Sequence, residues 1–298
     1  MKNILIIGCG LLGSSLLRRI QKKKLAKKIY IYEKSKSNIV KIKKLKLPGI
    51  LVNEIEDGVK KSDLIIFCTP MSEYKNLILK INKFLLKRTI ITDIGSSKIE
   101  TSKIIKKYLK KDIIWTQSHP IAGSEVSGPE HGKQDMFENK CCVLIKEKNT
   151  KKKNLTILGS FWKKMGSKVA IMSPEKHDKI FSITSHLPHL IAYNLVKSAQ
   201  DFEKIQNYDL IKYSAGGLRD FSRIAASNEI MWRDIFFNNR QNISKAIDLF
   251  IKNLNSFKKD INSRNNKSIL RKLIQTKKVR LKIIKLKQDI NKPDFGRD

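Results

Sequence analysis

The sequence predicts two domains, an α/β domain with a parallel sheet followed by an all-helical domain. Over residues 1–172, short apolar runs alternate with segments of helical spacing, and this alternation favours a parallel sheet with helices on both faces. From Pro174 onward we find long amphipathic segments and no clear strand, and Pro174 can start the first of these helices. We therefore expect domains at residues 1–172 and 173–298, because 298 residues with 41% hydrophobic content can bury two cores.

The expected elements follow in order along the chain. The strands are the apolar runs at residues 2–7 and 28–32 and those within DLIIFCTP, RTIITDIGSSK and DIIWTQSHP. The first helix is expected at residues 12–20, where Leu16, Leu17 and Ile20 have helical spacing. In the second half, helices are expected at residues 176–201, 208–213, 231–259 and 268–289.

The segment GCGLLG lies between the first strand and the first helix and fits the pattern G-x-G-x-x-G. In this pattern Gly8 would make the tight turn, Gly10 would let the backbone approach a pyrophosphate, and Gly13 would let helix and strand pack closely. The phosphates would lie at the N-terminus of the helix, where unpaired amides favour an anion. The sequence thus predicts a Rossmann-type dinucleotide-binding domain.

An acidic residue indicates which dinucleotide is bound. Glu33 ends the second strand about 20 residues after Gly13, where a carboxylate accepts hydrogen bonds from a ribose diol and repels a 2′-phosphate. NAD is therefore expected over NADP, although Lys34 and Lys36 could accommodate the extra phosphate. The expected cofactor-binding residues are Gly8, Gly10, Leu11, Leu12, Gly13, Glu33, Thr69 and Pro70.

The five histidines include one with a functional position. His119 lies in SHPIAGSEVSG, which we expect at the carboxyl end of a sheet strand, the edge at which open α/β sheets bind ligands. His186 and His189 are three residues apart on one expected helix, but no carboxylate or cysteine completes a ligand set nearby, so no metal site is expected. Arg219 and Arg223 could clamp a carboxylate, or could form surface ion pairs.

The formal net charge of +35 raises the alternative of a nucleic-acid-binding protein. The lysines are, however, spread along the whole chain, in RRIQKKKLAKK, KIKKLKL, IIKKYLKK and NTKKKN. We interpret them as solvated helix faces and expect no specific nucleic-acid partner.

Two further features concern the compartment. The four cysteines, Cys9, Cys68, Cys141 and Cys142, lack C-x-x-C spacing, and we expect reduced thiols. No run approaches the roughly 18 apolar residues of a membrane span, and glycines interrupt the N-terminal stretch, so we expect a cytoplasmic protein without membrane contact.

Taken together, several segments resemble the prephenate dehydrogenase family, which includes the arogenate and cyclohexadienyl dehydrogenases of tyrosine biosynthesis. The segments are GCGLLGSSL, TDIGSSK, SHPIAGSEVSGPEHG, SHLPHLIA and GGLRDFSRIAASNEIMW, in the family's order from residue 1 to about residue 240. The resemblance implies a dinucleotide-binding domain followed by a helical domain that carries the dimer contact. It also implies NAD-dependent oxidative decarboxylation of prephenate or arogenate by a homodimer.

The resemblance implies catalytic roles for two residues. His119 matches the histidine of the family's H-P-x-x-G motif, which as a neutral imidazole accepts a hydrogen bond from the substrate's C4 hydroxyl. Ser96 matches the serine that hydrogen-bonds the same hydroxyl or orients the imidazole, although Ser97 stands where the family usually has a valine.

The resemblance also implies a substrate-binding set. Arg223 matches the arginine that holds the ring carboxylate, and Trp232 matches a pocket aromatic that could be reached across the dimer. The remaining residues expected to line the pocket are His189, His186 and Ser185.

Three other functions compete with this interpretation. One is another NAD-dependent dehydrogenase with a helical second domain that acts on a different small carboxylate. The second is the nucleic-acid-associated protein suggested by charge alone. The third, an NAD-sensing regulator with an inactive site, is disfavoured because His119, Ser96 and Arg223 are all present.

Overall fold

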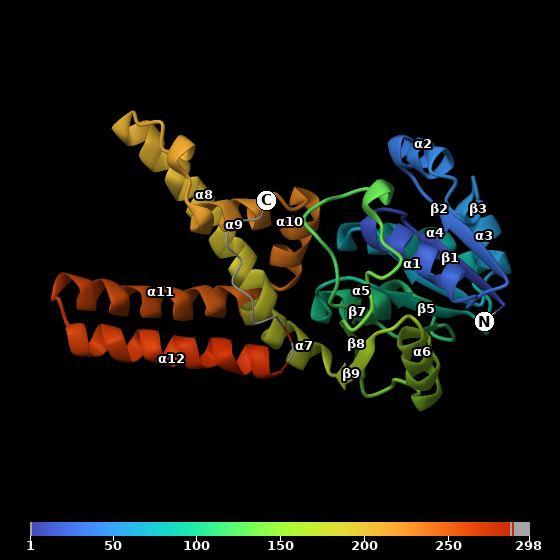
Figure 1. The fold of residues 1–298 in the computed structure, drawn as a ribbon. Helices are drawn as coiled ribbons and strands as arrows, with labels where there is room; N and C mark the ends of the chain where they lie inside the picture. The colour runs from blue at the N-terminus through green and yellow to red at the C-terminus, as the bar shows by residue number, and fades with distance from the viewer. Residues whose placement is uncertain (1, 287, 289–298) are drawn as a thin grey trace.

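The computed structural model describes residues 2–286 and 288, and its first half is built on a six-stranded parallel sheet. The strands lie in the order β3-β2-β1-β4-β5-β6, and Figure 1 shows this sheet with β1, β2, β3 and β5 labelled. Their bounds are β1 Asn3–Ile7, β2 Lys28–Tyr32, β3 Ile50–Leu51, β4 Leu64–Phe67, β5 Ile90–Asp93 and β6 Ile114–Trp115. All five pairings are parallel, which confirms the predicted architecture of this half.

Helices cover both faces of this sheet, because its central strands carry apolar side chains on both faces. Ile4 and Ile6 of β1 pack with Leu16 of α1, whereas Leu5 and Ile7 belong to a second core on the opposite face. The helices of this half are α1 Leu11–Lys22, α2 Lys36–Lys44, α3 Ile55–Lys61, α4 Tyr74–Ile81, α5 Ile99–Tyr108 and α6 Lys152–Lys164. Short 3₁₀ turns lie at Met71–Glu73, Asn82–Phe84 and Pro129–His131.

A second, three-stranded sheet is attached to the first and was not predicted. It consists of β7 Ser118–Pro120, β8 Cys141–Ile145 and β9 Lys168–Met172, with β7 antiparallel to β8 and β8 parallel to β9. His119 does follow the carboxyl end of a parallel strand, as expected, but it lies in a short strand of its own, which was not expected. The parallel strand β6 ends at Trp115, and His119 lies inside β7, opposite Val143 of β8.

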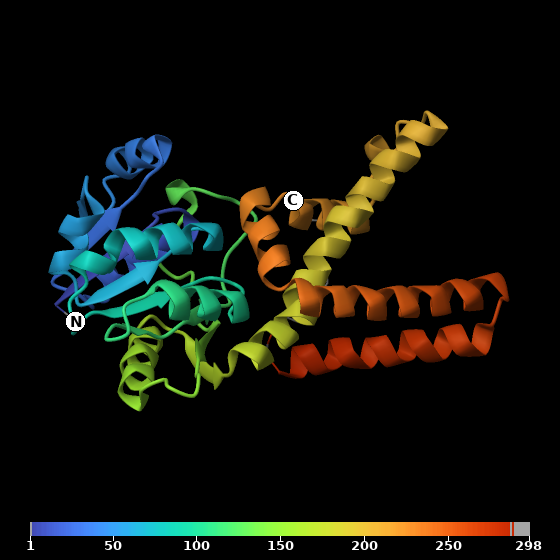
Figure 2. The same cartoon turned by 180° about the vertical axis from the view of Figure 1, so that it is seen from behind.

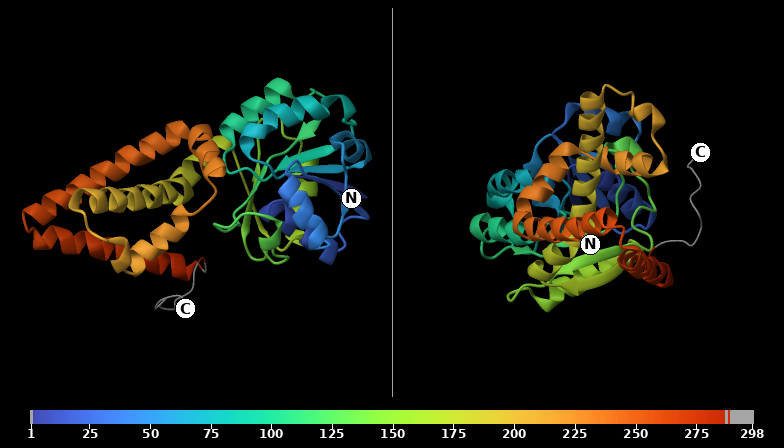
Figure 3. Two further views of the ribbon diagram at one scale, coloured as in Figure 1. Left: turned by 90° about the horizontal axis from the view of Figure 1, so that it is seen from above. Right: turned by 90° about the vertical axis from the view of Figure 1, so that its left-hand side faces the viewer.

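The second half contains helices and no strand in its described part, as predicted. Its helices are α7 Pro174–Phe181, α8 Leu187–Gln206, α9 Gly216–Ala225, α10 Glu229–Asn238, α11 Arg240–Asn262 and α12 Asn266–Lys285, with a 3₁₀ turn at Ile211–Tyr213. The helix expected at 208–213 was wrong: only this 3₁₀ turn forms there, and α9 was not expected. Helices α8, α11 and α12 extend away from the nucleotide-binding half (Figure 1 and Figure 3). Helix α10 lies against that half (Figure 2), where the Ser72 N–H donates to Asp234 Oδ2 over 2.8 Å.

Two predicted helices are interrupted. The segment at 176–201 is divided into α7 and α8 by a π-helical turn at Ser182–His186, just before Pro188. Proline removes a helical N–H and its ring crowds the carbonyl four residues earlier, and a wider turn relieves this conflict. The segment at 231–259 is two helices, because Asn239, with φ −116° and ψ 23°, ends α10 and starts α11. The predicted end of the last helix, at residue 289, lies outside the described residues.

Two other observations bear on the environment of the chain. Within residues 2–286, none of the helices is long and apolar enough to cross a membrane. All four cysteines are free thiols.

Candidate active site

The glycine turn between β1 and α1 has the geometry of a dinucleotide-binding loop. Gly8 has φ +88°, a conformation that suits glycine, and its N–H donates to the Tyr32 carbonyl of the neighbouring strand. A Cβ on Gly13 would lie 2.1 Å from the Gly8 carbonyl oxygen, so only glycine lets α1 approach the turn this closely. A Cβ on Gly10 would meet nothing within 4 Å, which leaves open space over the N-terminus of α1. This space is where a pyrophosphate would bind.

The residues around the turn also fit the rest of a dinucleotide. The Glu33 carboxylate accepts hydrogen bonds from the Cys9 N–H at 2.7 Å and from the Ser35 N–H at 2.8 Å, which fixes it at the tip of β2. Its remaining lone pairs can accept from a ribose diol. Beside Gly8, the buried Thr69 Oγ1 has no hydrogen-bond partner among the described residues. A buried polar atom of this kind is a natural contact for a bound ligand.

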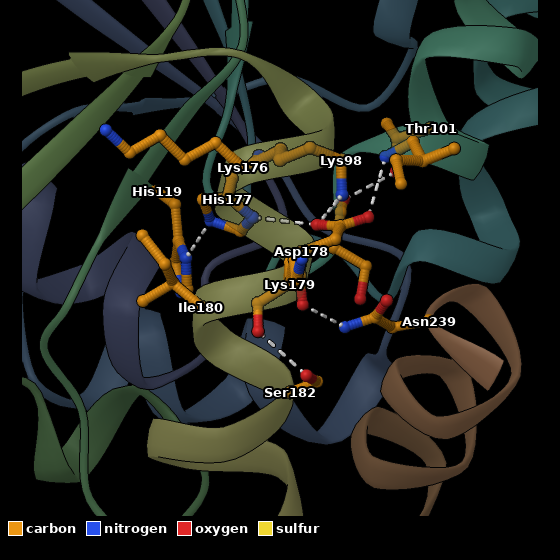
Figure 4. Close-up of polar contacts among 12 residues, drawn as sticks. Lys98, Thr101, His119, Lys176, His177, Asp178, Lys179, Ile180, Ser182 and Asn239 are labelled. Atoms are coloured by element: carbon orange, nitrogen blue, oxygen red, sulfur yellow. Dashed lines mark hydrogen bonds and ion pairs between the residues drawn. The ribbon is translucent and has the colours of Figure 1, made fainter. Parts of the chain in front are cut away.

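A chain of hydrogen bonds starts at His119 and crosses from β7 to α7 (Figure 4). His119 Nδ1 lies 2.8 Å from His177 Nε2, and His177 Nδ1 lies 2.7 Å from Asp178 Oδ1. The Asp178 carboxylate accepts the backbone N–H groups of Lys98 at 2.8 Å and Ile99 at 2.9 Å, at the start of α5. His119 is 8% exposed, and both His177 and Asp178 are fully buried.

Burial keeps these imidazoles uncharged. It lowers the pKa of His119 well below 6.5, and the neighbouring His177, Lys98 and His186 lower it further. Burial and Lys98 lower the pKa of His177 to about 2. Burial raises the pKa of Asp178, while the N–H groups of Ile99 and Lys98 oppose the rise. At neutral pH the two histidines are therefore neutral hydrogen-bonding groups.

A buried ion pair fixes the strand that carries His119. Lys98 Nζ lies 2.6 Å from Asp93 Oδ2 and donates to the Ser118 carbonyl over 2.7 Å, with both charged side chains fully buried. Ser118 Oγ also donates to the Asp93 carbonyl over 2.7 Å. Asp93 ends β5, so these contacts hold His119 at the same sheet edge as the glycine turn.

His186 joins this network from the π-helical turn. Its Nδ1 lies 3.1 Å from Asn239 Nδ2, and the same amide donates to the Asp178 carbonyl over 2.8 Å. Burial lowers the pKa of His186 to about 4; Asp178 and the Ser96 backbone carbonyl raise it, and His189 lowers it. Ser96 itself lies half-buried in the loop between β5 and α5.

Aromatic contacts extend the site along α8 and α10. The rings of His189 and Trp232 stack with centroids 3.8 Å apart and an interplanar angle of 22°, and His189 Nδ1 lies 3.0 Å from the Ser185 carbonyl. The buried Trp232 Nε1 has no partner among the described residues. Four of the predicted residues, His119, His186, His189 and Trp232, are thus connected through direct contacts and the intervening His177, Asp178 and Asn239.

Arg223 approaches the site from α9 but does not join this network directly. Its guanidinium lies 3.5 Å from Glu125, in the loop that follows His119, and 3.9 Å from Asp220 on its own helix. Its Nε is buried and unpartnered in the described part of the chain. The Arg223 side chain is 39% exposed, so its guanidinium can exchange these carboxylates for another anion.

No role was predicted from the sequence for His177, Asp178, Asn239 or Glu125. The pair His177-Asp178 follows Ser173-Pro174, which starts a helix, and a histidine next to an acid at that point was the one local signal. No pattern marks Asn239, because its role depends on α11 packing against the π-helical turn. No cluster of three or more possible metal ligands occurs among the described residues.

By its fold and site, this chain is a two-domain dinucleotide-dependent dehydrogenase, with a glycine turn in one domain and a helical second domain. The family model "Prephenate dehydrogenase, nucleotide-binding domain" matches residues 16–171, and "Prephenate dehydrogenase, dimerization domain" matches residues 173–276. The chain belongs to the prephenate dehydrogenase family.

Relatives cover nearly the whole chain. The cyclohexadienyl dehydrogenase of Zymomonas mobilis is 32% identical over 280 residues, 94% of this chain and 95% of the relative. The prephenate dehydrogenase of Bacillus subtilis is 30% identical over 270 residues, 90% of this chain and 72% of the relative. Among solved structures, the prephenate dehydrogenase of Aquifex aeolicus in complex with hydroxyphenyl propionate and NAD+ has a TM-score of 0.88 and 34% identity, and the match covers 95% of this chain and 98% of that one.

Proposed function

We propose that this protein catalyses the NAD-dependent oxidative decarboxylation of prephenate to 4-hydroxyphenylpyruvate in tyrosine biosynthesis. Arogenate, which would give tyrosine directly, is the second substrate to test. The observation that carries the proposal is the buried, uncharged imidazole of His119 at the sheet edge that bears the glycine turn. The Aquifex relative, bound to NAD+ and hydroxyphenyl propionate, supports the same cofactor and a hydroxyphenyl ligand.

The NAD held by the residues of the glycine turn would supply the acceptor for a hydride from C4 of the substrate, whose ring carboxylate would leave as carbon dioxide as the ring becomes aromatic. As the hydride leaves, positive charge develops at C4 and on its hydroxyl. A neutral His119 can accept a hydrogen bond from that hydroxyl and so stabilises the transition state. We assign Ser96 to the same hydroxyl.

Substrate binding is assigned to the helical domain. The Arg223 guanidinium would hold the ring carboxylate in a bidentate hydrogen bond and release Glu125, its present partner. The ring would lie near the stacked His189 and Trp232, whose indole N–H is free to donate. We also assign His186 and Ser185, from the π-helical turn, to the pocket.

We assign the cofactor to the glycine turn. The pyrophosphate would lie over Gly10, and Leu11 and Leu12 would contribute N–H groups at the start of α1. Glu33 would accept from the adenosine ribose. Thr69 and Pro70, after β4, complete the set.

We propose residues 1–172 as the nucleotide-binding domain and residues 173–298 as the substrate and dimerization domain of a homodimer. The free thiols suit a reducing compartment, and we place the enzyme in the cytoplasm. We assign no specific nucleic-acid partner. Another dehydrogenase activity, on a different small carboxylate, is the alternative function.

The test is NADH formation by the purified full-length chain with prephenate and arogenate offered side by side, each with NAD and with NADP. His119→Asn is the loss-of-function variant, and His131→Asn, which changes an exposed histidine, is its matched control. We expect turnover with NAD that His119→Asn reduces and His131→Asn leaves unchanged. Failure to turn over either substrate would refute the proposal in favour of the alternative dehydrogenase.

A further inference from the structure

The contacts of His119 decide which of its two ring nitrogens can face a substrate. A neutral imidazole carries one proton, so one nitrogen donates and the other accepts. Because His119 Nδ1 is used by His177, the nitrogen left for the substrate is Nε2. Whether Nε2 accepts or donates depends on the direction of the hydrogen bonds behind it.

That direction is set at Asp178, the far end of the chain. The N–H of Lys98 donates to its Oδ1 and the N–H of Ile99 donates to its Oδ2, so a fixed backbone donor points at each carboxylate oxygen. Both bonds stabilise the ionised carboxylate, which can only accept. The His177 Nδ1–H must then donate to Asp178, which leaves His177 Nε2 to accept.

The same logic continues to His119. Since His177 Nε2 accepts, the proton of His119 lies on Nδ1, and His119 Nε2 keeps its lone pair. We propose that His177 and Asp178 are positioning residues that fix the proton of His119 on Nδ1, so that its Nε2 accepts the hydrogen bond from the substrate hydroxyl. The kinetic part of this inference rests on the proposed function, but the proton position does not.

The opposite arrangement makes an opposite prediction. If Asp178 were protonated and donated to His177, every hydrogen bond in the chain would reverse and His119 Nε2 would carry the proton. An N–H at that position would donate to the hydroxyl oxygen and oppose the positive charge that develops there. The two arrangements are therefore distinguished by the protonation of a single nitrogen.

The first experiment measures that proton directly. The full-length chain is labelled with ¹⁵N-histidine, and ring nitrogen shifts are recorded at about pH 7, where histidines such as these are neutral. His131→Asn removes one ring from the spectrum and helps assign the others. We expect a protonated Nδ1 and an unprotonated Nε2 for His119. A protonated Nε2 overturns the proposal, whether or not the enzyme turns over prephenate.

The second experiment uses substitutions that redirect the chain. Asp178→Asn removes the charge that accepts from His177 and leaves one acceptor oxygen in place of two, and His177→Leu removes the acceptor of the His119 Nδ1–H. Each should give a mixture of His119 tautomers. For both we expect kcat to fall by about ten-fold to a hundred-fold, with KM changed less than about three-fold. His177→Gln, whose side-chain carbonyl can still accept from Nδ1–H, should recover most of kcat.

Asp178 also accepts hydrogen bonds from the first N–H groups of α5, so its substitution could unfold the protein. Folding of each variant is therefore checked by circular dichroism, and His177→Leu, which leaves this cap intact, tests the proposal if Asp178→Asn does not fold. A folded His177→Leu with wild-type kcat and an unchanged His119 spectrum would overturn the proposal. An equal loss of kcat in His177→Leu and His177→Gln would also overturn it. That result would mean that the enzyme needs the His177 ring for packing, since the acceptor that Gln retains would not restore kcat.

Discussion

Acidification should destabilise this protein through the buried histidine of the π-helical turn. His186 is fully buried, and its pKa in the folded state is about 4 against an ordinary value of 6.5. Below pH 6.5 the unfolded chain binds a proton that the folded chain does not, so the free energy of unfolding falls as pH falls. One pH unit corresponds to about 1.4 kcal/mol per group, which gives a loss of about 2 kcal/mol between about pH 6.5 and about pH 5.

Guanidinium denaturation followed by tryptophan fluorescence measures this loss, since the Trp232 ring centroid lies 6.3 Å from that of His186. His186→Asn retains an acceptor near the position of Nδ1 but cannot be protonated. This substitution should lower the free energy of unfolding at neutral pH, because the buried ring is lost. On acidification, however, the free energy of unfolding of the variant should fall by about 2 kcal/mol less than that of wild type. His177, with a pKa of about 2, contributes equally to both proteins. Equal losses in wild type and variant would refute the argument.

Four further outcomes follow from the site. His119→Asn should lower kcat roughly 10²-fold in steady-state assays, and an unchanged kcat would contradict its role. Arg223→Ala should act mostly on KM, because we propose that the guanidinium binds the carboxylate already in the ground state; a normal KM with a collapsed kcat would contradict this division. Gly13→Ala should lower the free energy of unfolding by at least about 2 kcal/mol, measured in urea, because its Cβ would lie 2.1 Å from the Gly8 carbonyl oxygen. Glu33→Ala should narrow the preference for NAD over NADP in titrations with both, and an unaltered ratio would show that this carboxylate does not select the cofactor.

The parallel sheet was predictable because its signals are local. The glycine motif, the apolar runs and the position of Glu33 each depend on a few neighbouring residues. The small sheet was missed because β7 is three residues long and its partner β8 lies more than twenty positions further along the chain. Short strands of this kind are defined by pairing and not by periodicity.

Candidate site residues could be predicted only where they lie in distinctive sequence segments, and not where their position depends on tertiary packing. His119 and Arg223 stand in distinctive segments, so their residue types were informative. The contribution of Asn239 could not be predicted, because it depends on the non-helical backbone conformation between α10 and α11. This conformation turns the Asn239 amide toward Asp178 and His186. The π-helical turn likewise depends on how Pro188 conflicts with the preceding turn, which apolar spacing does not reveal.

The hydrogen bond between His119 and His177 joins the nucleotide-binding half to the first helix of the helical half. Neither half therefore contains the complete hydrogen-bond chain from His119 to Asp178, and we expect the residues on its two sides to change together in evolution. A chimaera that takes its first 172 residues from this protein and the rest from a relative should keep its affinity for the dinucleotide. Its His119 imidazole would be oriented only if the relative has a histidine and an acid at the positions of His177 and Asp178.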